Sequence, residues 1–251
     1  MNVQETLLVL DKLAVDNELS RPYVVGGMVR DHHLPGMHQI RDVDITTGDK
    51  DAGKLAKLFA KQTGKELQGK EEDEHYFVIV DGIKYDFSKD FKYPNIDKLL
   101  AARQVKKATD LQKETFSRDF TINTLLRTLD FREELDLTGR GWADIQNKIL
   151  ECPVDCDVSF VHDPKRILRA FYFKAKFNMK FSDNVRASIN KNVKLLESIS
   201  DRYASEMVNK TVKADPNIMA ELIEMKVLQY IPLTKYITDT LLEQKKLLEV
   251  L

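Results

Sequence analysis

Two aspartates, Asp42 and Asp44, lie two residues apart in the run RDVDITT. Alternate residues of a β-strand point to the same side, so a strand here would project both carboxylates together. Two carboxylates this close repel each other, and a divalent cation that prefers oxygen ligands, Mg²⁺ or Mn²⁺, relieves the repulsion. The pair therefore predicts a metal site, where bound ions could activate a hydroxyl group and neutralise a leaving pyrophosphate. Asp86, in the later run IKYDF, could add a third carboxylate.

A glycine pair, Gly26-Gly27, precedes these acids in the run YVVGGMVRD. Two residues without a Cβ let another molecule approach the main chain closely, and the N–H groups of a helix that starts there can receive a phosphate. A glycine pair alone is usually a turn, and an Asp-x-Asp pair alone is usually on the surface. The combination with Arg30 and Asp31 favours nucleotide phosphate binding.

The elements that must position these residues follow from hydrophobic periodicity and from turn residues. The first half of the chain reads as alternating helices and strands, with a hairpin across Asp81-Gly82: helices over 3–19, 28–34 and 53–62, and strands over 23–25, 43–45, 76–80 and 83–87. From residue 119 onward the pattern is helical: 119–129, 164–178, 183–198, 202–213, 216–228 and 234–251. The sequence therefore predicts an α+β protein with an α/β part followed by an all-α part.

The combined string GGMVRD…RDVDITT resembles the signature of the nucleotidyltransferase head shared by bacterial-type CCA-adding enzymes (tRNA nucleotidyltransferases) and bacterial poly(A) polymerases, the class II nucleotidyltransferases. The resemblance implies a polymerase beta-like head with a mixed β-sheet, followed by an all-α neck and a short body. On this basis we expect a catalytic head over 1–135, a helical neck that recognises the base over 136–195, and a short body for RNA contact or dimerisation over 196–251.

Further motifs of that family follow in order. FSRDFTINTLL (116–126) resembles the second motif, and DIQNKILECP (144–153) resembles the segment that joins head and neck; HDPKRILRAFYFKAKF (162–177) resembles the neck helix that reads the base. The family has a second arginine where Ser117 stands and a glutamate where His162 stands. Asp163-Pro164 is also typical of a helix start, with an aspartate cap. The residues that the resemblance assigns to nucleotide binding are Gly26, Gly27, Arg30, Arg118, Asp119, Asn123, Asp163, Arg166 and Arg169; those it assigns to catalysis are Asp42, Asp44 and Asp86, with Asp42 and Asp44 holding the metal.

The activity that the resemblance implies is transfer of nucleotides from CTP and ATP to the 3′ end of a tRNA, with Mg²⁺ or Mn²⁺. Residues 162–194 carry nine Lys and Arg against two Asp, which suits an RNA partner. Lys165, Lys174 and Lys176 are the expected RNA contacts. Poly(A) tailing or partial CCA addition stays open, as do a catalytically silent RNA-binding relative and an enzyme that modifies a small molecule or a protein.

The composition of the 251 residues, 43% hydrophobic and 31% charged, is that of a globular protein, and no apolar run has the length of a membrane span. The first twenty residues carry acids and no basic start, so we expect no secretory signal, no membrane partner and a cytoplasmic protein. Cys152 and Cys156 read as two reduced thiols. Three histidines near the acids read as surface or phosphate neighbours, and a C-terminal apolar stripe reads as a packed helix or the seam of a homodimer: His32, His33 and His38, and Ile237, Leu241, Leu248 and Leu251.

Overall fold

The structure is a computed structural model that describes residues 2–36, 40–70, 75–88 and 92–231. It divides into two units, Met1–Gln146 and Asn147–Leu251, which are described separately below. None of the helices in the described ranges is both long and apolar enough to cross a membrane.

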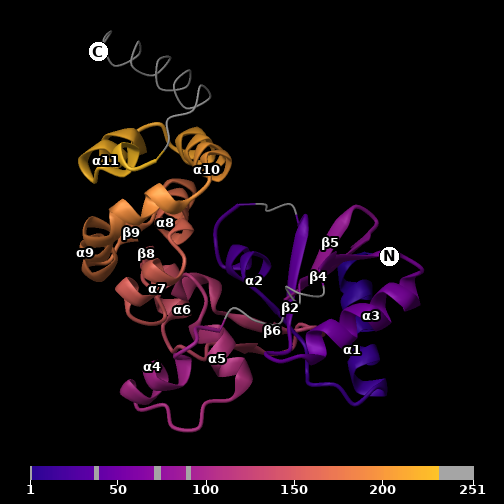
Figure 1. The fold of residues 1–251 in the computed structure, drawn as a ribbon. Coiled ribbons are helices and arrows are strands. Elements are labelled where there is room, and N and C mark those ends of the chain that lie inside the picture. The colour runs from indigo at the N-terminus through magenta and orange to yellow at the C-terminus, as the bar shows by residue number, and fades with distance from the viewer. Residues whose placement is uncertain (1, 37–39, 71–74, 89–91, 232–251) are drawn as a thin grey trace. The chain divides into compact units, whose positions relative to one another are not determined.

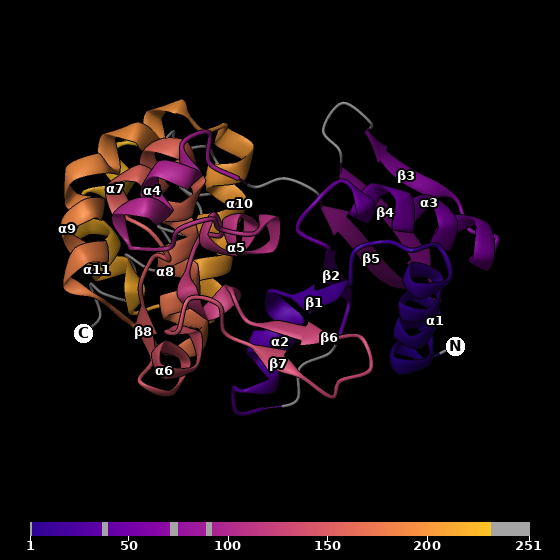
Figure 2. The ribbon, with the colours of Figure 1, turned by 90° about the horizontal axis from the view of Figure 1, so that it is seen from below.

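The first unit is built on a mixed seven-stranded sheet with the order β3-β4-β5-β2-β1-β6-β7. Neighbouring strands are antiparallel except β2 and β5, which run parallel. Strand β2, which carries Asp42 and Asp44, lies at the centre of this order (Figure 2). The strands are β1 (Tyr23–Val25), β2 (Asp42–Thr46), β3 (Leu67–Lys70), β4 (His75–Val80), β5 (Ile83–Ser88), β6 (Leu126–Thr128) and β7 (Glu134–Leu135).

Two amphipathic helices, α1 (Val3–Asp16) and α3 (Asp51–Thr63), belong to the core of this unit. Helix α3 packs on β4 and β5, where the ring of Phe59 lies 5.4 Å from that of Tyr85 and 5.9 Å from that of Phe87. Helix α1 packs against α3 and starts with a capping box, in which Asn2 and Glu5 bond each other's backbone N–H groups. The buried apolar faces of α1 and α3 thus hold β5 in place, and β5 pairs directly with β2.

Short elements complete the first unit. Helix α2 (Gly27–His32) follows β1 directly and packs against β1, β2 and the 3-10 turn η1 (Thr121–Asn123). Helix α5 (Asp110–Phe116) starts with a capping box formed by Thr109 and Gln112 and leads into the second motif. The remaining helices are α4 (Ile96–Ala102) and α6 (Gly141–Gln146).

The prediction of a helix over 119–129 is wrong. Only Thr121–Asn123 form a helical turn, and Leu126–Thr128 form strand β6, which pairs antiparallel with β1 so that Leu126 lies opposite Val25. Leu126 is fully buried in a cluster with Tyr23 and Val25. Three β-branched threonines, Thr121, Thr124 and Thr128, lower the helix propensity of the segment, and the open edge of β1 gives its backbone a pairing partner.

The second unit is mainly helical. Helix α8 (Lys165–Phe177) buries Ile167, Leu168 and Phe171 and packs side by side with α10 (Asp201–Ala214), as Figure 1 shows. Two short strands, β8 (Ile149–Leu150) and β9 (Lys180–Phe181), pair in parallel and are the exception to the expected all-α character. The other elements are α7 (Cys156–His162), α9 (Asp183–Asn192), α11 (Ile218–Glu224) and the 3-10 turns η2 (Val193–Ser198) and η3 (Val227–Gln229).

The predicted fold class, a mixed-sheet head followed by a helical part, is confirmed. Two predicted helices are shorter than expected, because 183–198 and 216–228 each end in a 3-10 turn, η2 and η3. The division near residue 146 differs by eleven residues from the expected end of the head at 135. The further boundary at 195 stays a prediction, and the expected helix over 234–251, with its apolar stripe, lies outside the described residues.

Candidate active site

The glycine turn between β1 and α2 closes directly against two charged side chains. Gly26 has φ +74° and ψ −132°, a conformation that L side chains rarely adopt. A Cβ added to Gly26 would lie 2.9 Å from Asp44 Oδ2 and 3.7 Å from Arg118 Nη1. The turn therefore brings main chain, carboxylate and guanidinium together, and a side chain at position 26 would occupy the space between them.

The predicted carboxylates gather on the parallel strands β2 and β5. Asp42 is exposed and Asp44 is half-buried, with the buried Val43 between them on the opposite face. In the parallel register Asp44 lies opposite Asp86, and Asp42 lies opposite Lys84. The structure thus places three acids and one lysine on one face of the two neighbouring strands.

Like charges and burial act on Asp44. Burial raises the pKa of the Asp44 carboxyl, Asp86 and Asp42 raise it further, and the positive charge of Arg118 offsets part of the increase. A raised pKa means that the ionised carboxylate is less favourable here than in water. Asp44 consequently needs additional positive charge to stay ionised without cost, which is what a divalent cation would supply.

Asp86 differs from the other two acids because it already has two partners. His75 Nε2 lies 2.6 Å from Asp86 Oδ1, and Lys84 Nζ donates to Asp86 Oδ2. The accessory role expected for Asp86 stays a prediction. Its side chain is 13% exposed, and both of its carboxylate oxygens already have a partner, so a cation bound by Asp86 would share the carboxylate with His75 or Lys84.

The second motif is tied to the glycine helix through buried hydrogen bonds. Arg30 Nη1 donates to Asn123 Oδ1 at 2.6 Å, and Asn123 Nδ2 donates to Asp119 Oδ1 at 2.9 Å. Asp119 Oδ1 also accepts from the Phe120 N–H at 2.8 Å, and Arg30 forms an ion pair with Asp31. Arg30 is 5% exposed, so the structure places it as an internal link between the two motifs. Its predicted contact with the triphosphate stays a prediction.

Arg118, the arginine of the second motif, has its own internal anchor. Its Nη2 donates to Glu114 Oε1 at 2.5 Å, and Glu114 is fully buried. Glu114 was not among the residues expected from the sequence, although an acid four residues before Arg118 is a readable signal of an ion pair.

The residues expected to read the base lie in the second unit. Arg166 is 5% exposed and its Nη1 donates to Ser159 Oγ at 2.9 Å, while its Nε lies 3.9 Å from Asp163 Oδ2. Asp163 Oδ1 accepts from the Lys165 N–H at 3.1 Å, so the aspartate accepts from the first helical amide of α8, from one position before the N-cap residue Pro164. Burial and the charge of Arg166 lower the pKa of His162, which favours a neutral imidazole beside that guanidinium.

Ser159 is a second residue that sequence reasoning missed. It lies three residues before His162, is fully buried, and accepts a hydrogen bond from the Arg166 guanidinium. A lone serine seven residues before an arginine gives no signal in sequence.

The basic residues of α8 have different surroundings. Lys165 Nζ lies 5.3 Å from the ring centroid of Tyr203, and Lys176 Nζ lies 4.8 Å from that of Phe177; Arg169 lies 5.2 Å from that of Phe173. Lys174 instead bonds Glu221 at 2.8 Å, and Arg186 bonds the same carboxylate. Lys174 therefore has a structural partner within the unit, and all three expected RNA contacts stay predictions.

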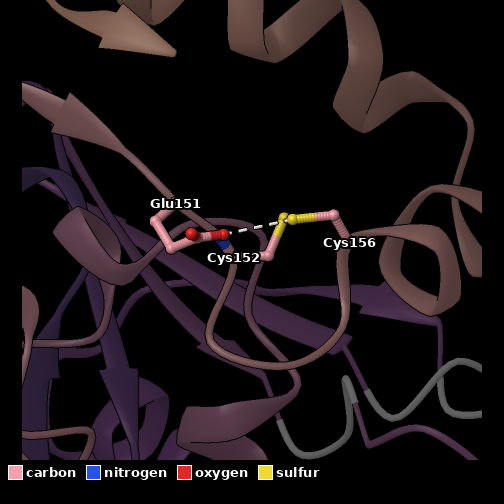
Figure 3. A group of neighbouring side chains, drawn as sticks. All are labelled: Glu151, Cys152 and Cys156. Carbon is pink, nitrogen blue, oxygen red and sulfur yellow. Dashed lines mark hydrogen bonds between the residues drawn. The ribbon is translucent and has the colours of Figure 1, made fainter. Parts of the chain in front are cut away.

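A buried cluster of Glu151, Cys152 and Cys156 lies apart from these residues in the second unit (Figure 3). The Cys156 thiol donates to Glu151 Oε1 at 3.1 Å, the Cys152 N–H donates to the same oxygen, and Asn184 donates to Oε2. A hydrogen bond with Cys152 and burial raise the pKa of the Cys156 thiol, which therefore stays protonated. Burial alone would raise the pKa of Glu151, but these donors lower it. The cluster brings three potential ligands within 4.8 Å, one fewer than a tetrahedral zinc site uses.

The histidines near the acids have different surroundings. His33 Nε2 lies 2.6 Å from Glu134 Oε1, and the ring of His32 lies 5.4 Å from that of His33. His38 lies outside the described residues.

Comparisons with known proteins agree with this architecture. The chain is 29% identical over 217 residues to the CCA-adding enzyme of Bacillus subtilis, covering 84% of this chain and 51% of that protein. It is 31% identical over 180 residues to the A-adding tRNA nucleotidyltransferase of Aquifex aeolicus, covering 70% of this chain and 21% of that protein. The chain thus spans about half or less of the length of these curated relatives.

Among solved structures, one described as "tRNA-processing enzyme (apo form I)" matches with a TM-score of 0.73 at 24% identity, covering 99% of this chain and 64% of that chain. One described as "Structure of tRNA-processing enzyme with CTP" matches with a TM-score of 0.69 at 26% identity, covering 88% and 57%. The model of the poly A polymerase head domain matches residues 22–151, more than half of the chain, and covers both the glycine turn and the second motif. The chain belongs to the family of proteins that carry the poly A polymerase head domain.

Proposed function

We propose that this protein is a template-independent RNA nucleotidyltransferase that adds nucleotides from CTP and ATP to the 3′ end of tRNA. The observation that carries the proposal is the meeting of Gly26, Asp44 and Arg118, because a glycine turn, a metal-binding carboxylate and a guanidinium at one point suit a nucleoside triphosphate. The names of the relatives support the choice of tRNA as acceptor.

Mg²⁺ or Mn²⁺ fits the donor set. Asp42 and Asp44 offer hard carboxylate oxygens on one face of β2, and burial, with Asp86 and Asp42 nearby, raises the pKa of Asp44, so that a cation would favour its ionised form. Asp42 and Asp44 would hold the ion, whose chemistry would be to favour ionisation of the attacking 3′-hydroxyl and to offset charge on the leaving pyrophosphate.

The protein's own groups do the rest by positioning and by charge. Asp42 and Asp44 would orient the reacting groups around the cation. Arg118 would pair with a phosphate oxygen, and the Gly26-Gly27 backbone would let the triphosphate approach closely. The bonded set Arg30, Asn123 and Asp119 would keep the glycine helix and the second motif in register with each other.

Base selection is assigned to Asp163 and Arg166, with Arg169 nearby on the same helix. A carboxylate acceptor and a guanidinium donor together match the edge of cytosine or adenine and leave uracil and guanine mismatched. Ser159 contributes by holding the guanidinium. Lys165 and Lys176 would contact the RNA backbone, which makes RNA affinity fall with salt.

The main alternative keeps the chemistry and changes the product to a poly(A) tail or to part of the CCA end. Similarity to an A-adding enzyme keeps the partial activity in view. A silent RNA-binding relative is disfavoured, because a binding module has no need for two adjacent carboxylates that face RNA. Transfer to a small molecule or a protein would leave labelled nucleotide off the RNA.

The cytoplasmic location and the homodimer stay predictions.

The test is an extension assay resolved to single nucleotides. Purified protein, Mg²⁺ and a tRNA lacking its 3′ CCA are incubated with CTP plus ATP and with each of the four nucleotides alone. We expect three additions with both nucleotides and a stop after two with CTP alone. A ladder with ATP alone would indicate a poly(A)-type enzyme, and one addition to a CC-ending tRNA only would indicate an A-adding enzyme. No extension of any RNA would refute the proposal.

A further inference from the structure

Glu114 is a buried acid that the proposed chemistry does not use. It lies in α5, its side chain is 0% exposed, and its Oε1 accepts a 2.5 Å hydrogen bond from Arg118 Nη2. Its second oxygen, Oε2, is buried and has no hydrogen-bond partner among the described residues. Burying a carboxylate with one oxygen lacking a hydrogen bond costs free energy of folding.

The cost shows that packing alone does not explain Glu114. Removing a carboxylate from water costs several kcal/mol, and a whole buried ion pair can often be replaced by apolar residues of similar volume with no loss of stability. Arg118 is the compensating charge, with a side chain only 12% exposed. The value of Glu114 to the protein therefore has to be sought in what it does to Arg118.

Arg118 stands between two acids. Its Nη2 is held by Glu114, while its Nη1 lies 3.7 Å from the point where a Gly26 side chain would begin, and Asp44 Oδ2 lies 2.9 Å from that same point. The charge of Arg118 already acts on Asp44. Without Glu114 the guanidinium would be attracted to Asp44 alone and would close onto the carboxylate that the cation needs.

We infer that Glu114 is a positioning residue that holds Arg118 back from Asp44, so that Asp44 stays open to the cation and Nη1 of Arg118 faces the nucleotide phosphates. This inference rests on the proposed function. Glu114 acts through Arg118 and touches neither substrate nor metal, so its loss should weaken nucleotide and Mg²⁺ use while leaving the fold intact.

The test compares Glu114→Gln, which keeps the shape and removes the charge, with Asp110→Asn, a matched change at an exposed acid of the same helix. CTP binding in Mg²⁺ is measured by isothermal titration calorimetry, and the Mg²⁺ concentration for half-maximal extension is measured on the tRNA lacking CCA. We expect Glu114→Gln to weaken CTP binding about tenfold, in line with loss of a charge-assisted contact, and to raise the Mg²⁺ requirement. Asp110→Asn should match the wild type in both.

A second comparison separates positioning from a general structural effect. In an Arg118→Lys background the fork that Glu114 holds is absent, so Glu114→Gln should add little further loss of CTP affinity. Thermal unfolding of Glu114→Gln should occur below the wild-type temperature, because the change removes the charge that compensates the largely buried guanidinium of Arg118. The comparison of CTP affinities in the two backgrounds therefore carries the test, and the loss of stability does not.

Wild-type CTP affinity and Mg²⁺ requirement in Glu114→Gln would overturn the inference while leaving the proposed function intact. Equal and additive losses in both backgrounds would also overturn it. If Glu114→Gln does not fold, Glu114→Asp, which withdraws the carboxylate by one methylene, replaces it: weaker CTP binding supports the inference and unchanged binding refutes it. Wild-type protein that neither binds CTP nor extends RNA would refute the proposed function itself.

Discussion

Asp44→Asn should make the protein more stable and inactive. Asp44 is half-buried and lies opposite Asp86 on neighbouring parallel strands, which are about 4.8 Å apart. One like-charge pair at about 5 Å is worth roughly 0.8 kcal/mol in water and roughly 3 kcal/mol at an effective dielectric of 20. Because Arg118 offsets part of this repulsion and Asp86 is paired with Lys84 and His75, we expect a gain near the lower limit, about 1 kcal/mol without divalent metal.

The stability difference between Asp44→Asn and the wild type should depend on pH. The pKa of Asp44 is raised in the folded protein, so ionising Asp44 costs stability as the pH rises through its folded pKa. The stability difference between Asp44→Asn and wild type should be absent below the unfolded value of about 3.9 and should reach its full size above the folded pKa. For a chain of this length, 1 kcal/mol corresponds to about 2–4 °C in the unfolding midpoint.

The assay is thermal unfolding from pH 4 to pH 8 in EDTA and again in Mg²⁺, with turnover measured on tRNA lacking CCA. Mg²⁺ at a hundred times its Kd should stabilise the wild type by about 2.7 kcal/mol and Asp44→Asn far less. Asp42→Asn, at an exposed position, should change metal-free stability by less than about 0.5 kcal/mol. A metal-free Asp44→Asn that is less stable than wild type at pH 7.5, or that gains as much from Mg²⁺, would refute the conclusion that burial and neighbouring acids make the ionised Asp44 unfavourable.

Gly26→Ala should lose turnover and about 1–3 kcal/mol of stability, measured by extension and urea unfolding, because its Cβ would lie 2.9 Å from Asp44 Oδ2 at φ +74°. Ser159→Ala removes a hydrogen bond to a buried guanidinium, and extension with each nucleotide alone should show relaxed selectivity together with about 1.5–3 kcal/mol lower stability. Lys176→Ala should reduce the salt dependence of RNA binding, measured by fluorescence anisotropy, whereas Lys174→Ala should mainly destabilise the unit by leaving Glu221 with one partner fewer.

The first half of the fold could be predicted because its strands and helices carry strong local patterns. The strand over 23–25 and the hairpin strands on either side of Asp81-Gly82 lie where alternation and turn residues place them. The segment 119–129 could not be predicted in the same way, since its apolar spacing fits a helix and only the distant edge of β1 makes Leu126–Thr128 a strand. Pairing between segments a hundred residues apart leaves no local trace.

The candidate site also has a part that the sequence predicts and a part that it does not. Residue types and spacing pointed to the acids on β2, and the resemblance to the family pointed to the arginine of the second motif. The bond from Arg30 to Asn123 spans 93 positions, and it makes a residue expected to contact the triphosphate an internal link as well. The bond from Arg166 to Ser159 could not be foreseen either, because a serine has no charge pattern that points to its partner. The sequence therefore pointed to candidate residues, whereas the contacts that support them required the structure.

Asp163 shows how one side chain can satisfy two demands that conflict in sequence. As a cap it must accept from the amide of Lys165, and as a base-reading residue it must stand beside Arg166. The structure divides these tasks between the two carboxylate oxygens: Oδ1 accepts from the Lys165 N–H at 3.1 Å, and Oδ2 lies 3.9 Å from Arg166 Nε. Capping fixes the orientation of the carboxylate, so it presents Oδ2 on the side of the arginine. The helix start and the proposed recognition of the base are therefore compatible, and the first supplies the rigidity that the second needs.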